Sequence, residues 1–187
     1  MKRILFIALI FALLSCNRSP SDKNDRIITV SIAPFRYFVE AIAGDDFKVN
    51  IIVPPGSNPH IYEPVPDQIN KLSRSEAFIS NGFLGFEMAW LDRFYEINTT
   101  MMRLSLGNII VPISEDHRER GEHTEGADPH YWVSPKCALL IAASIKELLV
   151  HLNPSEEEKY RINYSKLVEE IEEVDKKASS LFAEVTN

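Results

Sequence analysis

The sequence predicts an α/β fold in which a mostly parallel, four-stranded sheet is flanked by helices. Strand-like and helix-like stretches alternate four times between residues 26 and 113, which is the order typical of an α/β layer with helices on both faces. The first strand-like stretch is rich in β-branched residues and barely alternates between apolar and polar, as a strand buried on both faces does. The last part of the chain instead has apolar residues at helical spacing. Together these patterns predict a Rossmann-like lobe followed by one long helix.

The first predicted elements form a β-α-β unit. A strand is expected at residues 26–32, and Pro34 opens a helix over residues 35–43 that Gly44 ends. Proline is favoured at the first helical position and glycine just past the last one. The second strand is expected at residues 49–53. Because the connection is a short helical crossover, the two strands should be parallel and adjacent.

The middle of the chain continues the alternation. The expected elements are, in order, a short helix at 66–72, a strand at 77–81, a helix at 87–95, and short strands at 101–106 and 109–113. Trp90, Leu91 and Phe94 recur at helical spacing and predict the buried face of the second of these helices. Glu87 is expected to face solvent on the same helix.

Two helices close the chain. Ser134 is the predicted N-cap of a helix over residues 136–152, which Asn153-Pro154 should end. Ser155 then starts a capping-box pattern for the next helix. Apolar residues follow at spacings of four and three: Tyr160, Tyr164, Leu167, Ile171, Val174, Ala178, Leu181 and Val185. Residues 154–187 are therefore expected to form one long helix that packs along the lobe rather than as a free coiled coil.

The amino terminus has the pattern of an export signal. Residues 1–15 combine a basic start with an apolar stretch too short to cross a bilayer as a mature helix. Cys16 directly follows Leu-Leu-Ser, as in a bacterial lipobox, so we expect it to be lipidated and residues 16–25 to be a polar tether. An accidental cysteine is the alternative, but exported chains avoid an unpaired thiol. The sequence thus predicts a periplasmic or cell-surface lipoprotein. The second cysteine, Cys137, is expected in a helix core.

The composition limits the possible functions. The chain has 187 residues and 45% hydrophobic residues, which is enough for the core of one lobe and excludes a disordered protein. Its formal net charge of −7 argues against nucleic acid as a partner. Residues 114–127 contain no aliphatic side chain apart from one alanine and should form an exposed, acidic loop, in which His117 and His123 are possible metal contacts.

Two histidines stand in matching surroundings. His60 ends a Pro-Pro-Gly-Ser-Asn-Pro-His loop after the second strand, and His130 lies in an Asp-Pro-His-Tyr-Trp loop before a helix. Loops braced by proline lose little freedom on binding, and neutral imidazole suits zinc. We therefore predict that both side chains bind one transition metal at one rim of the sheet, although each alone could be an ordinary surface histidine. Glu63 could fix the tautomer of His60, as could a backbone carbonyl.

We do not expect the chain to be an enzyme. A secreted zinc-dependent hydrolase could use His60 and His130 with a metal-bound water. The sequence has neither a His-Glu-x-x-His helix nor a nucleophile elbow, and only Glu63 lies beside either histidine as a possible base. A metal-independent lipoprotein that docks a partner through the long helix is a further alternative.

The order of motifs resembles the zinc- and manganese-uptake solute-binding proteins of bacterial ABC importers, which are metal receptors with two lobes joined by one long helix. The matching segments are 30–34, 54–64, 80–82, 128–135 and the helix from Ser155. The resemblance implies that the amino-terminal lobe, residues 26–153, supplies His60 and His130 as ligands. It implies a third histidine and a carboxylate from a carboxy-terminal lobe, before which this chain is expected to end.

The same resemblance suggests the cargo and the partner. The protein would capture zinc, or alternatively manganese, and deliver it to a cognate ABC permease, and we expect a monomer. The acidic segment 114–127 falls where zinc-preferring members carry a His-rich loop, which favours zinc over manganese because manganese prefers oxygen ligands. A solvated run of charges explains this segment equally well.

Overall fold

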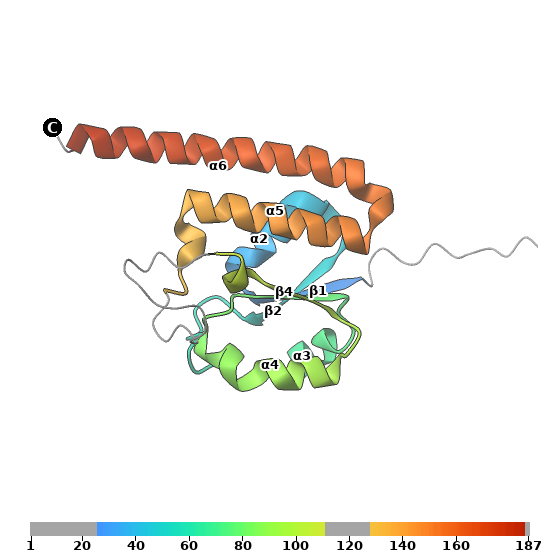
Figure 1. Ribbon diagram of the computed structural model, residues 1–187. Helices are drawn as coiled ribbons and strands as arrows, with labels where there is room; N and C mark the ends of the chain where they lie inside the picture. Colours follow the sequence, from blue (N-terminus) through green and yellow to red (C-terminus); the bar gives the residue numbers. More distant parts are fainter. Residues whose placement is uncertain (1–25, 111–127, 186–187) are drawn as a thin grey trace, which may run out of the picture.

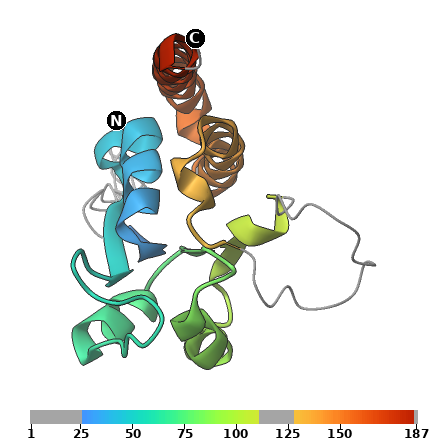
Figure 2. The same ribbon diagram turned by 90° about the vertical axis from the view of Figure 1, so that its left-hand side faces the viewer.

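The computed structural model describes residues 26–110 and 128–185 of the chain. The predicted signal peptide, the tether with Cys16, and the acidic segment with His117 and His123 lie outside the described residues, as do residues 186–187. Figures 1 and 2 show the described part from two directions at right angles to each other.

The centre of the lobe is a four-stranded sheet in which every neighbouring pair of strands is parallel. Its strands are β1 (Ile27–Ile32), β2 (Lys48–Val53), β3 (Ala77–Ser80) and β4 (Met102–Ser105), in the spatial order β2-β1-β3-β4. Every residue of β1 and β3 is buried, which explains why these central strands read as continuous rather than alternating runs. The predicted mostly parallel sheet is confirmed.

The strand predicted over residues 109–113 is wrong in its described part. After β4 the chain turns through a 3₁₀ helix at Leu106–Asn108, and neither Ile109 nor Ile110 belongs to a strand. Ile110 is 4% exposed and packs in the core. An apolar residue that turns inward from a loop gives the same short sequence signal as a strand.

Helices cover both faces of the sheet, as predicted (Figures 1 and 2). One face of the sheet is covered by α2 (Ala33–Ala43) and α5 (Pro135–Leu152). The other face is covered by α3 (Pro66–Leu72) and α4 (Gly85–Ile97). The long helix α6, Glu157–Val185, lies outside α2 and α5 and contacts both. Within the described ranges, no single helix is long and apolar enough to cross a membrane; α5 and α6 meet that test only as a pair bent by 119°.

The helix starts differ in detail from the sequence prediction. Ser134 does precede α5, but its side chain makes no cap hydrogen bond. The predicted capping box before α6 is wrong, because a 3₁₀ turn at Pro154–Glu156 intervenes and the Ser155 hydroxyl donates to Asn153 Oδ1 at 3.0 Å. Cys137 is buried in α5 with a free thiol, as expected.

The prediction that Glu87 faces solvent is also wrong. Helix α4 starts at Gly85, so Glu87 lies in its first turn, where it is only 1% exposed. Its carboxylate is turned back toward the end of β3, where the backbone N–H groups of Asn81 and Gly82 donate to it. Helical spacing could not reveal this, because hydrogen bonds to a preceding loop can draw a carboxylate inward.

Candidate metal centre

The His60 loop is a tight turn fixed by its own polar groups. The amide of Ser57 donates to the carbonyl of Pro54 at 3.2 Å, and Gly56 has a φ of 85°, a conformation that glycine adopts without steric cost. The backbone N–H of His60 donates to Asn58 Oδ1 at 3.0 Å. The loop therefore holds the His60 backbone in place while its side chain is exposed.

The His130 loop is fixed in a similar way, by an aspartate. The backbone N–H of His130 donates to Asp128 Oδ1 at 2.9 Å, and the same oxygen lies 2.7 Å from His130 Nδ1. The hydrogen bond from the His130 amide, followed by that from its ring, lowers the pKa of Asp128. The His130 ring also contacts the Trp132 ring, with centroids 5.2 Å apart.

The contact with Asp128 determines which ring nitrogen of His130 is available. A carboxylate that accepts from Nδ1–H leaves Nε2 with its lone pair, which is the form that binds metals. Asp128 belongs to the Asp-Pro-His-Tyr-Trp motif, but an orienting role was predicted only for Glu63, as a partner of His60. In the described part of the chain, Glu63 is exposed and makes no hydrogen bond to His60; its role stays a prediction. The signal that could have identified Asp128 is its spacing, since an aspartate two residues before another residue commonly accepts that residue's amide.

Both histidine loops contact the same segment, residues 81–86, which joins β3 to α4. On one side, the amide of Phe86 donates to the carbonyl of Pro59 at 3.3 Å. On the other side, Asn81 Nδ2 donates to the carbonyl of Pro129 at 3.0 Å. Each bond is to the residue directly before a histidine. The backbones of His60 and His130 therefore both lie next to this connection, which starts at the carboxyl end of β3.

Aromatic side chains pack the His130 loop against the rest of the lobe. The Tyr131 hydroxyl donates to the carbonyl of Asn81 at 2.7 Å, and burial raises the pKa of Tyr131 far above its usual value. The Tyr131 ring packs edge-on against Phe83, and Trp132 packs edge-on against Phe35. Tyr131 and Trp132 thus pack against the lobe.

The described residues offer two nitrogen donors rather than a closed site. Across residues 26–110 and 128–185, no group of three or more His, Cys, Asp or Glu side chains is arranged to hold a metal ion. His151, in the last turn of α5, lies at the opposite end of that helix from His130.

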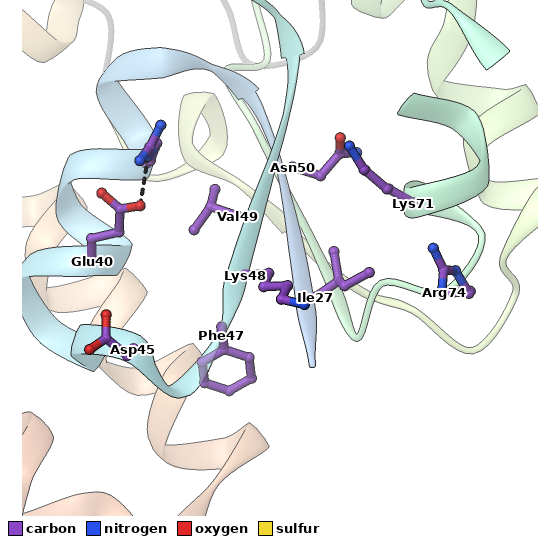
Figure 3. Close-up of a pocket in the computed structure, with 10 residues that line it drawn as sticks. Ile27, Glu40, Asp45, Phe47, Lys48, Val49, Asn50, Lys71 and Arg74 are labelled. Atoms are coloured by element: carbon purple, nitrogen blue, oxygen red, sulfur yellow. Dashed lines mark hydrogen bonds and ion pairs between the residues drawn. The ribbon is translucent and has the colours of Figure 1, made fainter. Parts of the chain in front are cut away.

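A separate pocket of about 760 Å³ lies at the amino-terminal ends of β1 and β2 (Figure 3). It is lined by Ile27 and Lys48, the first residues of β1 and β2, whereas the histidine loops follow strand ends. Its charged walls carry both signs, with Lys71 and Arg74 on one side and Glu40 on the other. Neither histidine contributes to it.

Gly85 lies against the His60 backbone, and a substitution can test this contact. A Cβ at Gly85 would lie 2.8 Å from the carbonyl oxygen of His60 and 3.3 Å from its Cα. We expect Gly85→Ala to displace the His60 loop and to weaken zinc binding about tenfold, since overpacking against backbone costs about 1–3 kcal/mol. A competition titration against a chromophoric chelator measures the affinity.

The matched control for this prediction is Ala89→Gly on the exposed side of the same helix. It lowers helix stability by about 1 kcal/mol without approaching His60. We expect it to bind zinc like the unmodified chain. Equal zinc affinities for the two variants would show that contact between α4 and the His60 loop does not matter for binding.

Comparison with known proteins identifies the family. The model of the family described as zinc-uptake complex component A, periplasmic (ZnuA), matches residues 28–187. The chain belongs to this family. The resemblance inferred from the two Pro-His motifs is thereby confirmed.

The curated relatives that this chain matches are named for different metals. The metal ABC transporter substrate-binding lipoprotein FimA of Streptococcus parasanguinis is 27% identical over 188 residues, which cover 97% of this chain and 60% of FimA. The manganese ABC transporter substrate-binding lipoprotein PsaA of Streptococcus pneumoniae is 29% identical, covering 95% of this chain and 59% of PsaA. The iron ABC transporter substrate-binding lipoprotein MtsA of Streptococcus pyogenes serotype M1 is also 29% identical, with 92% and 57% covered.

The solved structures point to the same fold. A zinc-bound ZnuA with residues 138–173 deleted aligns with a TM-score of 0.71 and 35% identity, covering 81% of this chain and 56% of that chain. A second ZnuA crystal structure aligns with a TM-score of 0.70 and 34% identity. The present chain thus spans a little over half the length of the ZnuA structures and of the curated relatives that it matches.

Proposed function

We propose that this chain is the metal-capturing part of an extracytoplasmic substrate-binding lipoprotein that delivers a transition metal to an ABC importer. The observation that supports this most directly is the pair of hydrogen bonds by which residues 81–86 hold both Pro-His loops. Membership of the ZnuA family and the substrate-binding relatives named for zinc, manganese or iron transport support the same function. They do not favour the hydrolase or the metal-independent docking module.

In this proposal, His60 and His130 bind the metal through imidazole nitrogen. Asp128 orients the His130 ring, and the reaction is reversible binding without covalent chemistry. Two imidazoles leave the remaining positions of a metal ion to water or to groups beyond the described residues. Residues 26–153 would form the metal-binding lobe and residues 154–187 the helix that links it to the rest of the receptor. Glu63, His117 and His123 would be accessory contacts.

Zinc is the cargo that the donor set favours. Zinc accepts nitrogen ligands readily, whereas manganese is better served by oxygen donors. Lipidation at Cys16 would hold the receptor at the membrane beside its permease. Metabolic labelling with a palmitate analogue would test whether Cys16 is lipidated.

Calorimetric titration of the full chain with Zn²⁺ and with Mn²⁺ tests the proposal. We expect a single zinc ion to bind with measurable heat, and manganese to bind at least about tenfold more weakly, because imidazole donors discriminate in this direction. Acidification should release the metal, since imidazole must lose its proton to bind. A chain that takes up neither ion at neutral pH would exclude the proposed function for this lobe.

A further inference from the structure

The proposed ligands do not explain why a carboxylate is buried beside the segment that both histidine loops contact. Glu87 is 1% exposed in the first turn of α4. Burying a charged carboxylate is costly unless hydrogen bonds compensate. Burial raises the pKa of Glu87, while hydrogen bonds from Ser31, Asn81 and Gly82 oppose that shift. A costly group of this kind, bonded to the segment that both histidine loops contact, calls for a role beyond packing.

The hydrogen bonds of Glu87 join the two ends of the segment that both histidine loops contact. The Asn81 amide donates to Oε1 at 2.7 Å and the Gly82 amide donates to Oε2 at 2.6 Å. The Ser31 hydroxyl, from the end of β1, also donates to Oε1. Both carboxylate oxygens are therefore acceptors for the backbone at the end of β3. This arrangement ties the start of α4 back to the strand from which it emerges.

Asn81 transmits this constraint to the His130 loop. It is fully buried, and each of its polar groups has a partner. Its backbone amide donates to Glu87, its carbonyl accepts from Tyr131, its Oδ1 accepts from the Phe83 amide, and its Nδ2 donates to the carbonyl of Pro129. A shift of the Asn81 backbone would therefore move the residue that directly precedes His130.

The His60 loop depends on the same carboxylate through the helix start. Phe86, which donates to the carbonyl of Pro59, directly precedes Glu87 in the first turn of α4. Gly85 lies against the His60 backbone. The bonds that Glu87 accepts from the amides of Asn81 and Gly82 tie this turn to the end of β3, so the two histidine loops share one buried anchor.

We propose that Glu87 is a positioning residue, which acts through Asn81 and the first turn of α4 to hold the His60 and His130 loops in the arrangement that a bound metal requires. This inference rests on the proposed function. Glu87 itself would not touch the metal. Its effect is on the geometry of the two donors before the metal arrives.

Glu87→Gln tests the acceptor role while it preserves side-chain volume. A glutamine has one acceptor oxygen, and its amide group would face a backbone N–H that donates to Glu87 in the native chain. We expect Co²⁺, used as a spectroscopic substitute for zinc, to bind about 10- to 100-fold more weakly, the range seen when a partner of a metal ligand is lost. The visible absorption bands of the bound Co²⁺ should also change in shape.

A readout without metal separates positioning from general destabilisation. In the metal-free full chain, the imidazole NMR signals of His60 and His130 should shift in Glu87→Gln, while those of His151, at the far end of α5, should not. Asn81→Ala removes only the side-chain bonds to Pro129 and Phe83, so it should shift His130 and leave His60 in place. This second variant also keeps the inference testable if Glu87→Gln does not fold.

The control is Glu96→Gln, the same chemical change on an exposed position of α4. It should bind Co²⁺ like the unmodified chain. Native affinity and unshifted histidine signals in Glu87→Gln would overturn the positioning role. If His130→Ala binds Co²⁺ as tightly as the unmodified chain, the proposed function fails instead, and the metal-free signals still decide whether Glu87 positions the loops.

Discussion

Replacing either His60 or His130 by alanine is expected to weaken zinc binding more than any other single change in this lobe. Each substitution removes one of the two proposed nitrogen donors, and among the described residues no group of three or more His, Cys, Asp or Glu side chains could hold a metal ion instead. Losing a residue that only orients a ligand typically costs about 10- to 100-fold in metal affinity. Losing a ligand should exceed that range. Calorimetry on the full chain measures the effect directly.

The double variant makes this prediction sharper. If the two imidazoles bind the same ion, removing both should leave little more to lose than removing either one, because effects within one site are strongly non-additive. If they are independent surface sites, the two losses should add. His151→Ala is the control, since His151 is exposed in the last turn of α5; it should bind zinc normally. Normal zinc affinity in both single variants would refute the assignment.

The sheet could be predicted from the sequence because its strands and helices have strong local patterns. The run of β-branched residues at β1 predicts a buried strand, and every residue of β1 is buried. Pro34 and Gly44 mark the two ends of α2. Local signals and burial therefore agree in these elements. Where the signal was short, as at Ile109 and Ile110, the prediction failed. Two apolar residues fit a strand or a buried turn equally well, and only the packing of the whole lobe decides between them.

The sequence pointed to the two exposed histidine loops of the candidate site but not to the buried residues that hold them. The loops of His60 and His130 stand out because proline and histidine at strand ends suggest a rigid donor. Glu87 and Asn81 did not stand out, because their roles come from hydrogen bonds between segments that are distant in the sequence, such as Asn81 to Pro129. Helical spacing placed Glu87 on the outside, and no local pattern could show that the end of β3 offers it two backbone donors.

The attachment of the long helix gives the largest expected effect on stability. Asp46 is only 6% exposed and ends the short 3₁₀ turn Gly44–Asp46 that follows α2. It accepts hydrogen bonds from Lys159 Nζ at 2.7 Å and from the Tyr160 hydroxyl at 2.9 Å. Tyr160 is fully buried, and its hydroxyl also accepts from Asn153 Nδ2. We expect Asp46→Ala to lower the free energy of unfolding by about 3 kcal/mol, the lower end of the range for breaking a buried ion pair, because the Lys159 side chain is 38% exposed.

Urea unfolding of the metal-free chain, followed by circular dichroism, measures this loss, and hydrogen exchange shows where it falls. We expect the amides in the first turns of α6 to lose protection before those of β1 and β3. The reason is that the hydrogen bonds of Asp46 fasten α6 to the lobe and do not join the strands to each other. Asp45→Ala is the matched control, since Asp45 is the exposed neighbour in the same short turn, and it should change stability by less than about 0.5 kcal/mol. If the two variants unfold alike, α6 is held by its apolar contacts with α2 and α5, and the Asp46 bonds add nothing to its attachment.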